Sequence, residues 1–122
     1  MAKRILSVSY DAALLRSREM ILQRQGYEVT SVQSLQDAIS QCRREMFDVA
    51  LIGHAIPIAE QMNIVGELRK NCPGAKVVAL TARPMSPAPY ADHSVDAMKP
   101  DELVAELRHL FAEADSGKAK RV

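Results

Sequence analysis

Short apolar segments recur along the whole chain and are separated by longer amphipathic segments. The apolar segments lie at 5–9, 27–32, 47–52, 75–80 and 94–98, and they are rich in Val, Ile and Leu. Runs of this length that are bounded by turn residues are typical of β-strands. The run at 47–52 does not alternate with polar residues, which indicates a strand buried on both faces. The pattern therefore predicts five strands.

The intervening segments carry apolar residues at helical spacing. A first helix is predicted over 12–25, because four leucine and isoleucine residues share one of its faces and Gly26 can take the left-handed conformation that ends a helix. Three further helices are predicted over 34–46, 62–70 and 100–114.

Strands that alternate with helices indicate β-α-β crossovers, and therefore a parallel sheet with helices on both faces. Five strands in this pattern favour the flavodoxin-like α/β fold with strand order 2-1-3-4-5. The 122 residues suit one domain, which we place at 1–114 and expect to be followed by a flexible basic tail over 115–122.

The composition mainly excludes kinds of partner and kinds of site. Apolar residues make up 48% and charged residues 25%, with a net charge of +1, so we expect no nucleic-acid or membrane partner. No apolar run approaches the roughly 18 residues of a membrane helix, and no signal peptide is expected at the N-terminus. Cys42 and Cys72 stand far apart without a metal-binding pattern, so we expect reduced thiols, a cytoplasmic location, no metal and no cofactor.

Several short pieces of sequence occur in the order and spacing of a known family. They are residues 4–6, 26–29 and 47–52, then Pro57, residues 80–82 and the pair Lys99-Pro100. Together they resemble the response regulator receiver domain of two-component and phosphorelay signalling, over about residues 3–114. No single piece is specific, but their joint order on the predicted β-α pattern is.

The resemblance implies a site at the carboxyl ends of the strands. In the family, two acidic residues and an aspartate hold Mg²⁺, and the aspartate accepts a phosphoryl group from a histidine kinase. In this chain the acidic pair falls on Ser9 and Tyr10, and the acceptor falls on Gly53. Thr81 and Lys99, at the positions that contact the phosphoryl oxygens, are retained.

This residue set predicts a degenerate phosphorylation site and no catalytic residue. Ser9 and Tyr10 offer only neutral oxygens, whereas a hard cation prefers charged ones. Gly53 has no side chain, so no acyl phosphate can form there. We therefore expect a pseudo-receiver that is not an enzyme.

The segment 82–93 departs from the family in another way. Pro84, Pro87 and Pro89 stand where the family has a fourth helix, and proline removes a backbone donor and disfavours helix before it. We expect the fourth helix to be short or missing and the segment to be irregular and mobile. The family's switch aromatic falls on Asp96, which also argues against a phosphorylation-driven switch.

Other polar residues have competing interpretations. Asp11 is favoured as a helix N-cap over a substitute ligand, and Asp48 is expected to be structural at the opposite end of the sheet. His54 is favoured as a solvent-facing loop residue over an atypical phosphoryl acceptor. Lys99 is expected to find a neutral acceptor such as the Ser9 or Thr81 hydroxyl, although an anion site there stays open. His93 and His109 form no recognisable group in the sequence.

The favoured function is a stand-alone receiver-like signalling domain that acts by phosphorylation-independent protein–protein interaction. Its expected partner is a histidine kinase or a downstream signalling protein, and a weak homodimer is compatible with the sequence. Two alternatives stay open: a phosphorelay receiver with an unusual acceptor such as His54, and a flavodoxin-like domain that binds a small ligand. Against the second, the chain has no glycine-rich phosphate loop.

Overall fold

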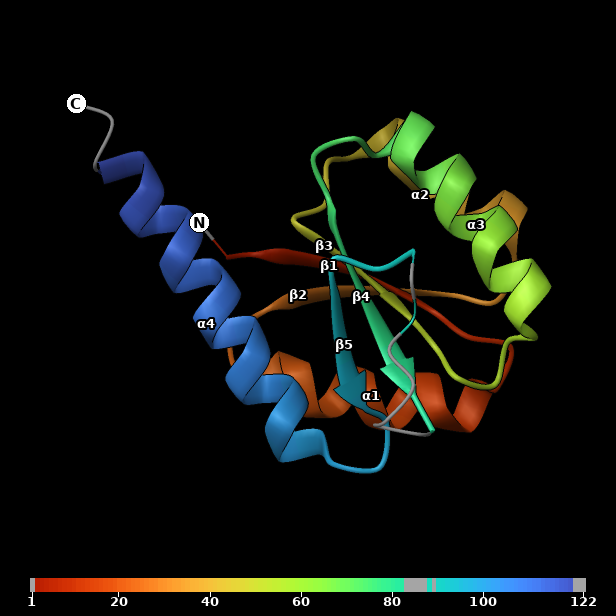
Figure 1. Ribbon diagram of the computed structural model, residues 1–122, viewed down its shortest axis with the longest axis horizontal. Coiled ribbons are helices and arrows are strands. Elements are labelled where there is room, and N and C mark those ends of the chain that lie inside the picture. The colour runs from red at the N-terminus through yellow and green to blue at the C-terminus, as the bar shows by residue number, and fades with distance from the viewer. Residues whose placement is uncertain (1, 83–87, 89, 120–122) are drawn as a thin grey trace.

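The computed structural model describes residues 2–82, 88 and 90–119, with side chains described up to residue 114. In this part of the chain, five strands and four helices follow one another (Figure 1). They are β1 (Arg4–Val8), α1 (Ala12–Arg24), β2 (Glu28–Val32), α2 (Leu35–Arg44), β3 (Val49–Ile52), α3 (Ile58–Asn71), β4 (Lys76–Thr81), β5 (His93–Asp96) and α4 (Pro100–Ala119).

The five strands form one parallel sheet in the order β2-β1-β3-β4-β5, as predicted. β1 lies in the interior, where Val8 pairs with Val32 on one side and with Ile52 on the other. At the far edge, Thr81 of β4 pairs with Asp96 of β5. The carboxyl ends of all five strands therefore lie along one edge of the sheet (Figure 1).

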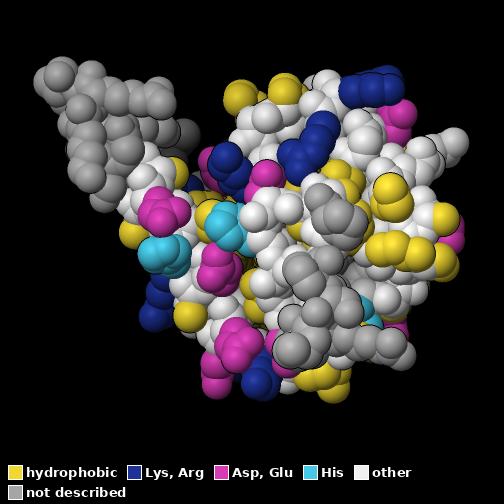
Figure 2. Space-filling view, viewed as in Figure 1, with side chains coloured by type: hydrophobic (Ala, Val, Ile, Leu, Met, Phe, Trp, Pro, Cys, Tyr) yellow, Lys and Arg dark blue, Asp and Glu magenta, His cyan; other side chains and the backbone are white. Residues whose placement is uncertain are grey.

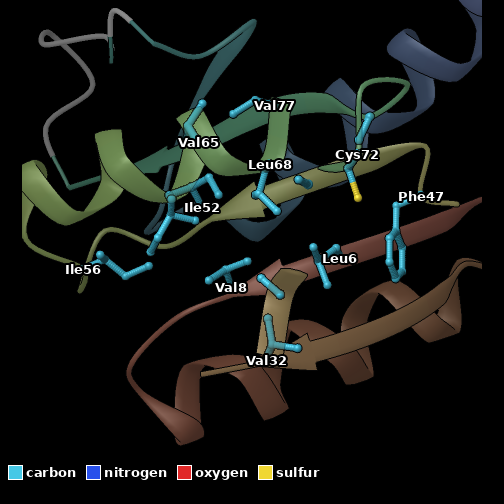
Figure 3. Close-up of a cluster of buried hydrophobic side chains, with 14 residues drawn as sticks. Leu6, Val8, Val32, Phe47, Ile52, Ile56, Val65, Leu68, Cys72 and Val77 are labelled. Atoms are coloured by element: carbon cyan, nitrogen blue, oxygen red, sulfur yellow. The ribbon is translucent and has the colours of Figure 1, made fainter. Parts of the chain in front are cut away.

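Two apolar layers cover the two faces of the sheet, because successive side chains of a strand point to opposite faces. On one face, the β1 residues Leu6 and Val8 belong to one apolar cluster with Ala38 of α2 and with residues of α3. Figure 3 shows the β1 residues and the α3 residues Val65 and Leu68 of this cluster. On the other face, Ile5 of β1 packs with Leu22 of α1 and Leu107 of α4. The helices lie on both faces as predicted, with α1 and α4 on one and α2 and α3 on the other.

Local chemistry explains most of the element boundaries. Asp11 accepts hydrogen bonds from the first backbone N–H groups of α1, and Gly26 has the predicted positive φ, +89°. α3 begins at Ile58, directly after Pro57 and four residues earlier than expected. β5 ends at Asp96 rather than at residue 98, because the Asp96 carboxylate accepts the Met98 N–H at 2.9 Å and turns the chain.

No helix is described between β4 and β5, which agrees with the predicted loss of the fourth helix. The prolines on which that prediction rested, at 84, 87 and 89, lie outside the described residues, as does the predicted mobility of this segment. The described end of the segment is held against α3. Tyr90 donates a hydrogen bond to Gln61, and Arg69 donates to the Tyr90 carbonyl at 2.7 Å.

The expectation of two reduced cysteines is wrong for this structure, in which Cys42 and Cys72 form a disulfide. Cys42 lies in α2 and Cys72 caps the end of α3, and their Cα atoms are 5.5 Å apart. Their separation of 30 positions in the sequence conceals this proximity, which arises because α2 and α3 pack side by side on one face of the sheet (Figure 1).

The last helix continues to Ala119, five residues past the expected end of the domain at 114. Residues 120–122 lie outside the described part, so a flexible tail over 115–122 stays a prediction. No helix among the described residues combines the length and apolarity needed to cross a membrane.

Candidate functional site

The predicted site residues lie along the carboxyl edge of the sheet. Ser9 directly follows β1, Gly53 directly follows β3, and Thr81 is the last residue of β4. The Gly53 N–H donates to the Val8 carbonyl at 2.9 Å, so the parallel pairing of β1 and β3 continues to their ends. Lys99 lies three residues past β5, in the loop that leads to α4.

Ser9 and Gly53 are packed directly against each other. Ser9 is fully buried, and its Oγ accepts the Asp11 N–H at 3.1 Å. A Cβ atom built on Gly53 would lie 3.0 Å from Ser9 Cβ and 3.1 Å from both Ser9 Oγ and the Val8 carbonyl oxygen. A side chain at Gly53, the predicted acceptor position, would therefore require the end of β1 to move by a few tenths of an ångström.

Tyr10 and Asp11, the two residues after Ser9, form hydrogen bonds with α3 and α1 respectively. The Tyr10 hydroxyl donates to Glu60 Oε1 of α3 at 3.0 Å. Partial burial, this hydrogen bond and the Glu60 charge all raise the pKa of the Tyr10 phenol, so Tyr10 stays neutral at neutral pH. Asp11 Oδ1 accepts from Ala13 and Leu14, which confirms its role as the N-cap of α1.

These positions do not fit the ligand set of a Mg²⁺ ion. Ser9, Tyr10 and Gly53 supply no charged oxygen, and the polar atoms of Ser9 and Tyr10 already have protein partners. Among the described residues, no group of three or more His, Cys, Asp or Glu is placed to hold a metal.

Thr81 and Lys99 do not converge on a common point. Thr81 Oγ1 donates to the Val95 carbonyl at 3.4 Å. Lys99 is exposed, and its Nζ lies 3.5 Å from Glu102 Oε1 in the first turn of α4. The predicted neutral acceptor for Lys99 is therefore wrong: an acidic residue three positions away pairs with the ammonium group at the protein surface.

Asp48 lies away from this edge, and His93 and His109 each pair with one acidic residue. Asp48 Oδ2 accepts the Arg4 N–H at 2.8 Å at the amino ends of β1 and β3, which is the structural role predicted for it. His93 and His109 each lie 3.0 Å from a glutamate of α4, Glu106 and Glu113 respectively.

His54 is not a freely solvated loop residue as predicted, because it is half-buried against α1. Arg18 of α1 donates from Nη2 to His54 Nδ1 at 3.4 Å. Arg18 is itself only 7% exposed. Burial lowers the pKa of the Arg18 guanidinium and the Asp11 charge partly opposes this, but an arginine remains protonated in any case.

Arg18 was missed at the level of sequence, although a signal is present. It lies four residues after Leu14 and four before Leu22, so it interrupts the apolar face of the first helix. A charged residue on the buried face of an amphipathic helix indicates either a buried partner or a site.

Comparisons with known proteins add to this geometry, although no family model matches the sequence. The alginate biosynthesis transcriptional regulatory protein AlgB of Pseudomonas aeruginosa PAO1 is 28% identical over 96 residues, which are 79% of this chain and 20% of AlgB. A response regulator receiver protein of Anaeromyxobacter sp. strain Fw109-5 is 29% identical over 105 residues, which are 86% of this chain and 42% of that protein.

Among solved structures, a CheY-like response regulator receiver domain protein from Methanospirillum hungatei JF-1 superposes with a TM-score of 0.81 at 25% identity, covering 96% of this chain and 99% of that one. These findings support a response regulator receiver domain. A second similar structure is the response regulator TrrA of Thermotoga maritima in complex with the histidine kinase ThkA, with a TM-score of 0.75 at 26% identity, covering 88% of this chain and 97% of the matched chain. This chain spans 20% of the length of AlgB and 42% of the length of the Anaeromyxobacter protein.

Proposed function

We propose that this receiver domain signals by binding a histidine kinase, and that the binding does not depend on phosphorylation of the domain. The observation that carries the proposal is the contact between Gly53 and Ser9. Gly53 has no side chain at the predicted acceptor position, and a Cβ atom there would lie only 3.0–3.1 Å from Ser9 and the Val8 carbonyl oxygen. Signalling through aspartyl phosphate at this position has no chemical basis.

A histidine kinase is the proposed partner because TrrA, which is similar to this chain over 88% of its length, forms a complex with a histidine kinase. The carboxyl edge also carries an exposed apolar surface suited to a protein contact. Tyr10, Ile58 and Met62 are 40%, 59% and 55% exposed, and Ile58 and Met62 share one face of α3. Figure 2 shows apolar side chains exposed over this helix.

The first experiment tests for phosphorylation. The protein is incubated with acetyl phosphate and Mg²⁺ and then measured by intact mass spectrometry at neutral pH, where both aspartyl and histidyl phosphates survive. We expect no added phosphoryl group. A phosphorylated form would overturn the proposal, and a His54→Gln variant would then show whether His54 is the acceptor, since it directly follows Gly53.

The second experiment tests the contact. Binding to the purified kinases of the source organism is measured by biolayer interferometry, with and without ATP, and we expect one kinase to bind equally well in both conditions. Met62→Glu should weaken that binding about tenfold or more, because it places a charge in an apolar contact. Met46→Glu is the matched control, since Met46 is 82% exposed at the opposite end of the sheet. Binding that requires ATP, or equal effects of the two variants, contradicts the proposal.

A further inference from the structure

A pocket of about 400 Å³ lies between α1 and the start of α4, beside the carboxyl edge of the sheet. α1 forms one side of it, and the turn after β5 and the first residues of α4 form the other. Its lining is mainly apolar and includes Leu14, Ile21, Leu80, Met98 and Leu103. Its volume falls in the range of about 300–1,000 Å³ that is common for small-molecule sites.

The pocket wall contains a buried cation with unused hydrogen-bonding capacity. Arg18 lines the pocket and is 7% exposed. Its Nη2 contacts His54 Nδ1, whereas its Nη1 is buried without a hydrogen-bond partner among the described residues. A buried guanidinium donor without an acceptor is costly, and that cost disappears when an anion supplies the acceptor.

The other charged groups at the pocket limit the charge of such an anion. Lys99 also lines the pocket, but it is 61% exposed and already pairs with Glu102. Asp96 lines the same pocket and carries the opposite charge. Because Lys99 is paired with Glu102, the Arg18 guanidinium is the main positive charge at the pocket, and the negative charge of Asp96 partly opposes it. One guanidinium suits a single negative charge better than the two charges of a phosphate dianion.

We propose that this pocket binds a small monocarboxylate with a short apolar substituent, whose carboxylate is held by Arg18 and whose apolar part contacts the α1 and α4 side chains. A carboxylate presents two oxygens with the spacing of the guanidinium donors. The leucine, isoleucine and methionine side chains of the lining suit an apolar substituent. The proposal does not rest on the proposed kinase binding, and Ser9 and Gly53 do not line the pocket.

The experiment uses pairs of probes that differ only in charge. Phenylacetate and hexanoate, with phenylacetamide and hexanamide as their neutral counterparts, are titrated into the isotope-labelled protein and followed by NMR. We expect the two carboxylates to shift the backbone signals of α1 and of the β5–α4 turn saturably, and the two amides and inorganic phosphate to have no such effect. No saturable shift with either carboxylate, or equal binding of acid and amide, overturns the proposal.

Variants then test Arg18 itself. Arg18→Met keeps an unbranched apolar stem and removes the charge, and we expect carboxylate affinity to fall about tenfold or more. Arg16→Met is the matched control on the same helix, because Arg16 is exposed and does not line the pocket. The acid–amide comparison needs only the unmodified protein, so a failure of Arg18→Met to fold leaves the test intact. Unchanged affinity in a folded Arg18→Met variant overturns the proposal.

Discussion

Gly53 and Ser9 fit each other at the ends of two neighbouring strands. Each is a small residue, and the hydrogen bond from the Gly53 N–H to the Val8 carbonyl holds the two chain segments together. The Ser9 hydroxyl in turn accepts the Asp11 N–H and so positions the start of α1. Gly53, the predicted acceptor position, is therefore part of a packed contact between two strand ends.

A substitution at Gly53 tests this contact. We expect Gly53→Ala to lower the free energy of unfolding by about 1–3 kcal/mol, because its Cβ would lie too close to Ser9 and to the Val8 carbonyl. Gly53→Asp should cost more, since it also places a carboxylate in this buried space. Urea unfolding followed by circular dichroism measures both.

Gly66→Ala is the control, because Gly66 lies within α3 and an added Cβ there meets no described atom within 4 Å. It should raise stability by about 0.5–1 kcal/mol through helix propensity. Equal or greater stability of Gly53→Ala would show that the end of β1 yields easily and that the acceptor position is not closed.

Single residues divide into those that the sequence could predict and those that depend on packing. The N-cap Asp11 and the left-handed Gly26 follow from local chemistry, and both were predicted correctly. The pairing of Lys99 with Glu102 follows from the spacing of three residues at the start of a helix, whereas the resemblance to the family points to an acceptor at the strand ends. The Arg18–His54 contact joins residues 36 positions apart, so its partner could not be read from either local segment.

At the scale of elements, α3 supports the chain segment that enters β5. Arg69 Nη1 lies 3.6 Å from Asp92 Oδ2, and the same carboxylate oxygen accepts the Val77 N–H of β4 at 2.8 Å. With the Tyr90–Gln61 hydrogen bond, these contacts connect α3, β4 and the start of β5. They anchor the β4–β5 connection on its described side.

The Asp92 carboxylate gives this anchor a defined pH dependence. Burial raises the pKa of Asp92 and is the largest single effect, but the Val77 hydrogen bond and the charges of Arg69 and Lys76 together outweigh it and hold the pKa below its ordinary value of 3.8. A folded pKa below the unfolded one stabilises the protein above the unfolded pKa, and this stability is lost as the pH falls through the folded pKa.

We expect Asp92→Asn to lower stability by about 1 kcal/mol at neutral pH, because the hydrogen bond and ion pair to a charged carboxylate are lost at a partly exposed site. The difference from the unmodified protein should stay constant down to about pH 4 and shrink below it. Urea midpoints over a pH series measure this. A difference that is the same at every pH would show that the Asp92 charge is not involved.

The alternation of strands and helices predicted every described element and the strand order, because both follow from patterns within short segments and from the geometry of β-α-β crossovers. Boundaries were less accurate where a side chain redirects the chain, as at Pro57 before α3 and at Asp96 after β5. Such turns depend on a single hydrogen bond or a single proline ring, and the spacing of apolar residues gives no information about either.

At the scale of the whole molecule, the Cys42–Cys72 disulfide joins the two helices on one face of the sheet. Closing a loop of 30 residues reduces the entropy of the unfolded chain, which predicts a stabilisation of about 3–4 kcal/mol. The Cys42→Ala, Cys72→Ala double variant should lose this amount in urea unfolding.

Dithiothreitol provides the control for the disulfide prediction. It should shift the urea midpoint of the unmodified protein toward that of the double variant and leave the double variant itself unchanged. An unmodified protein whose midpoint is insensitive to the reductant would mean that the bond is absent or that it contributes nothing to stability.

The interior position of β1 determines the order in which a growing chain can complete the sheet. During synthesis from the N-terminus, β1 can pair with β2 and β3 while β5 has not yet been made. β5 is a four-residue edge strand, and its core residue Val95 packs in the same layer as Leu107 of α4, the last element to emerge. The face of the sheet that α1 and α4 share is therefore the later of the two faces to be covered. A nascent chain exposes the apolar surface of that face for longer than the surface under α2 and α3.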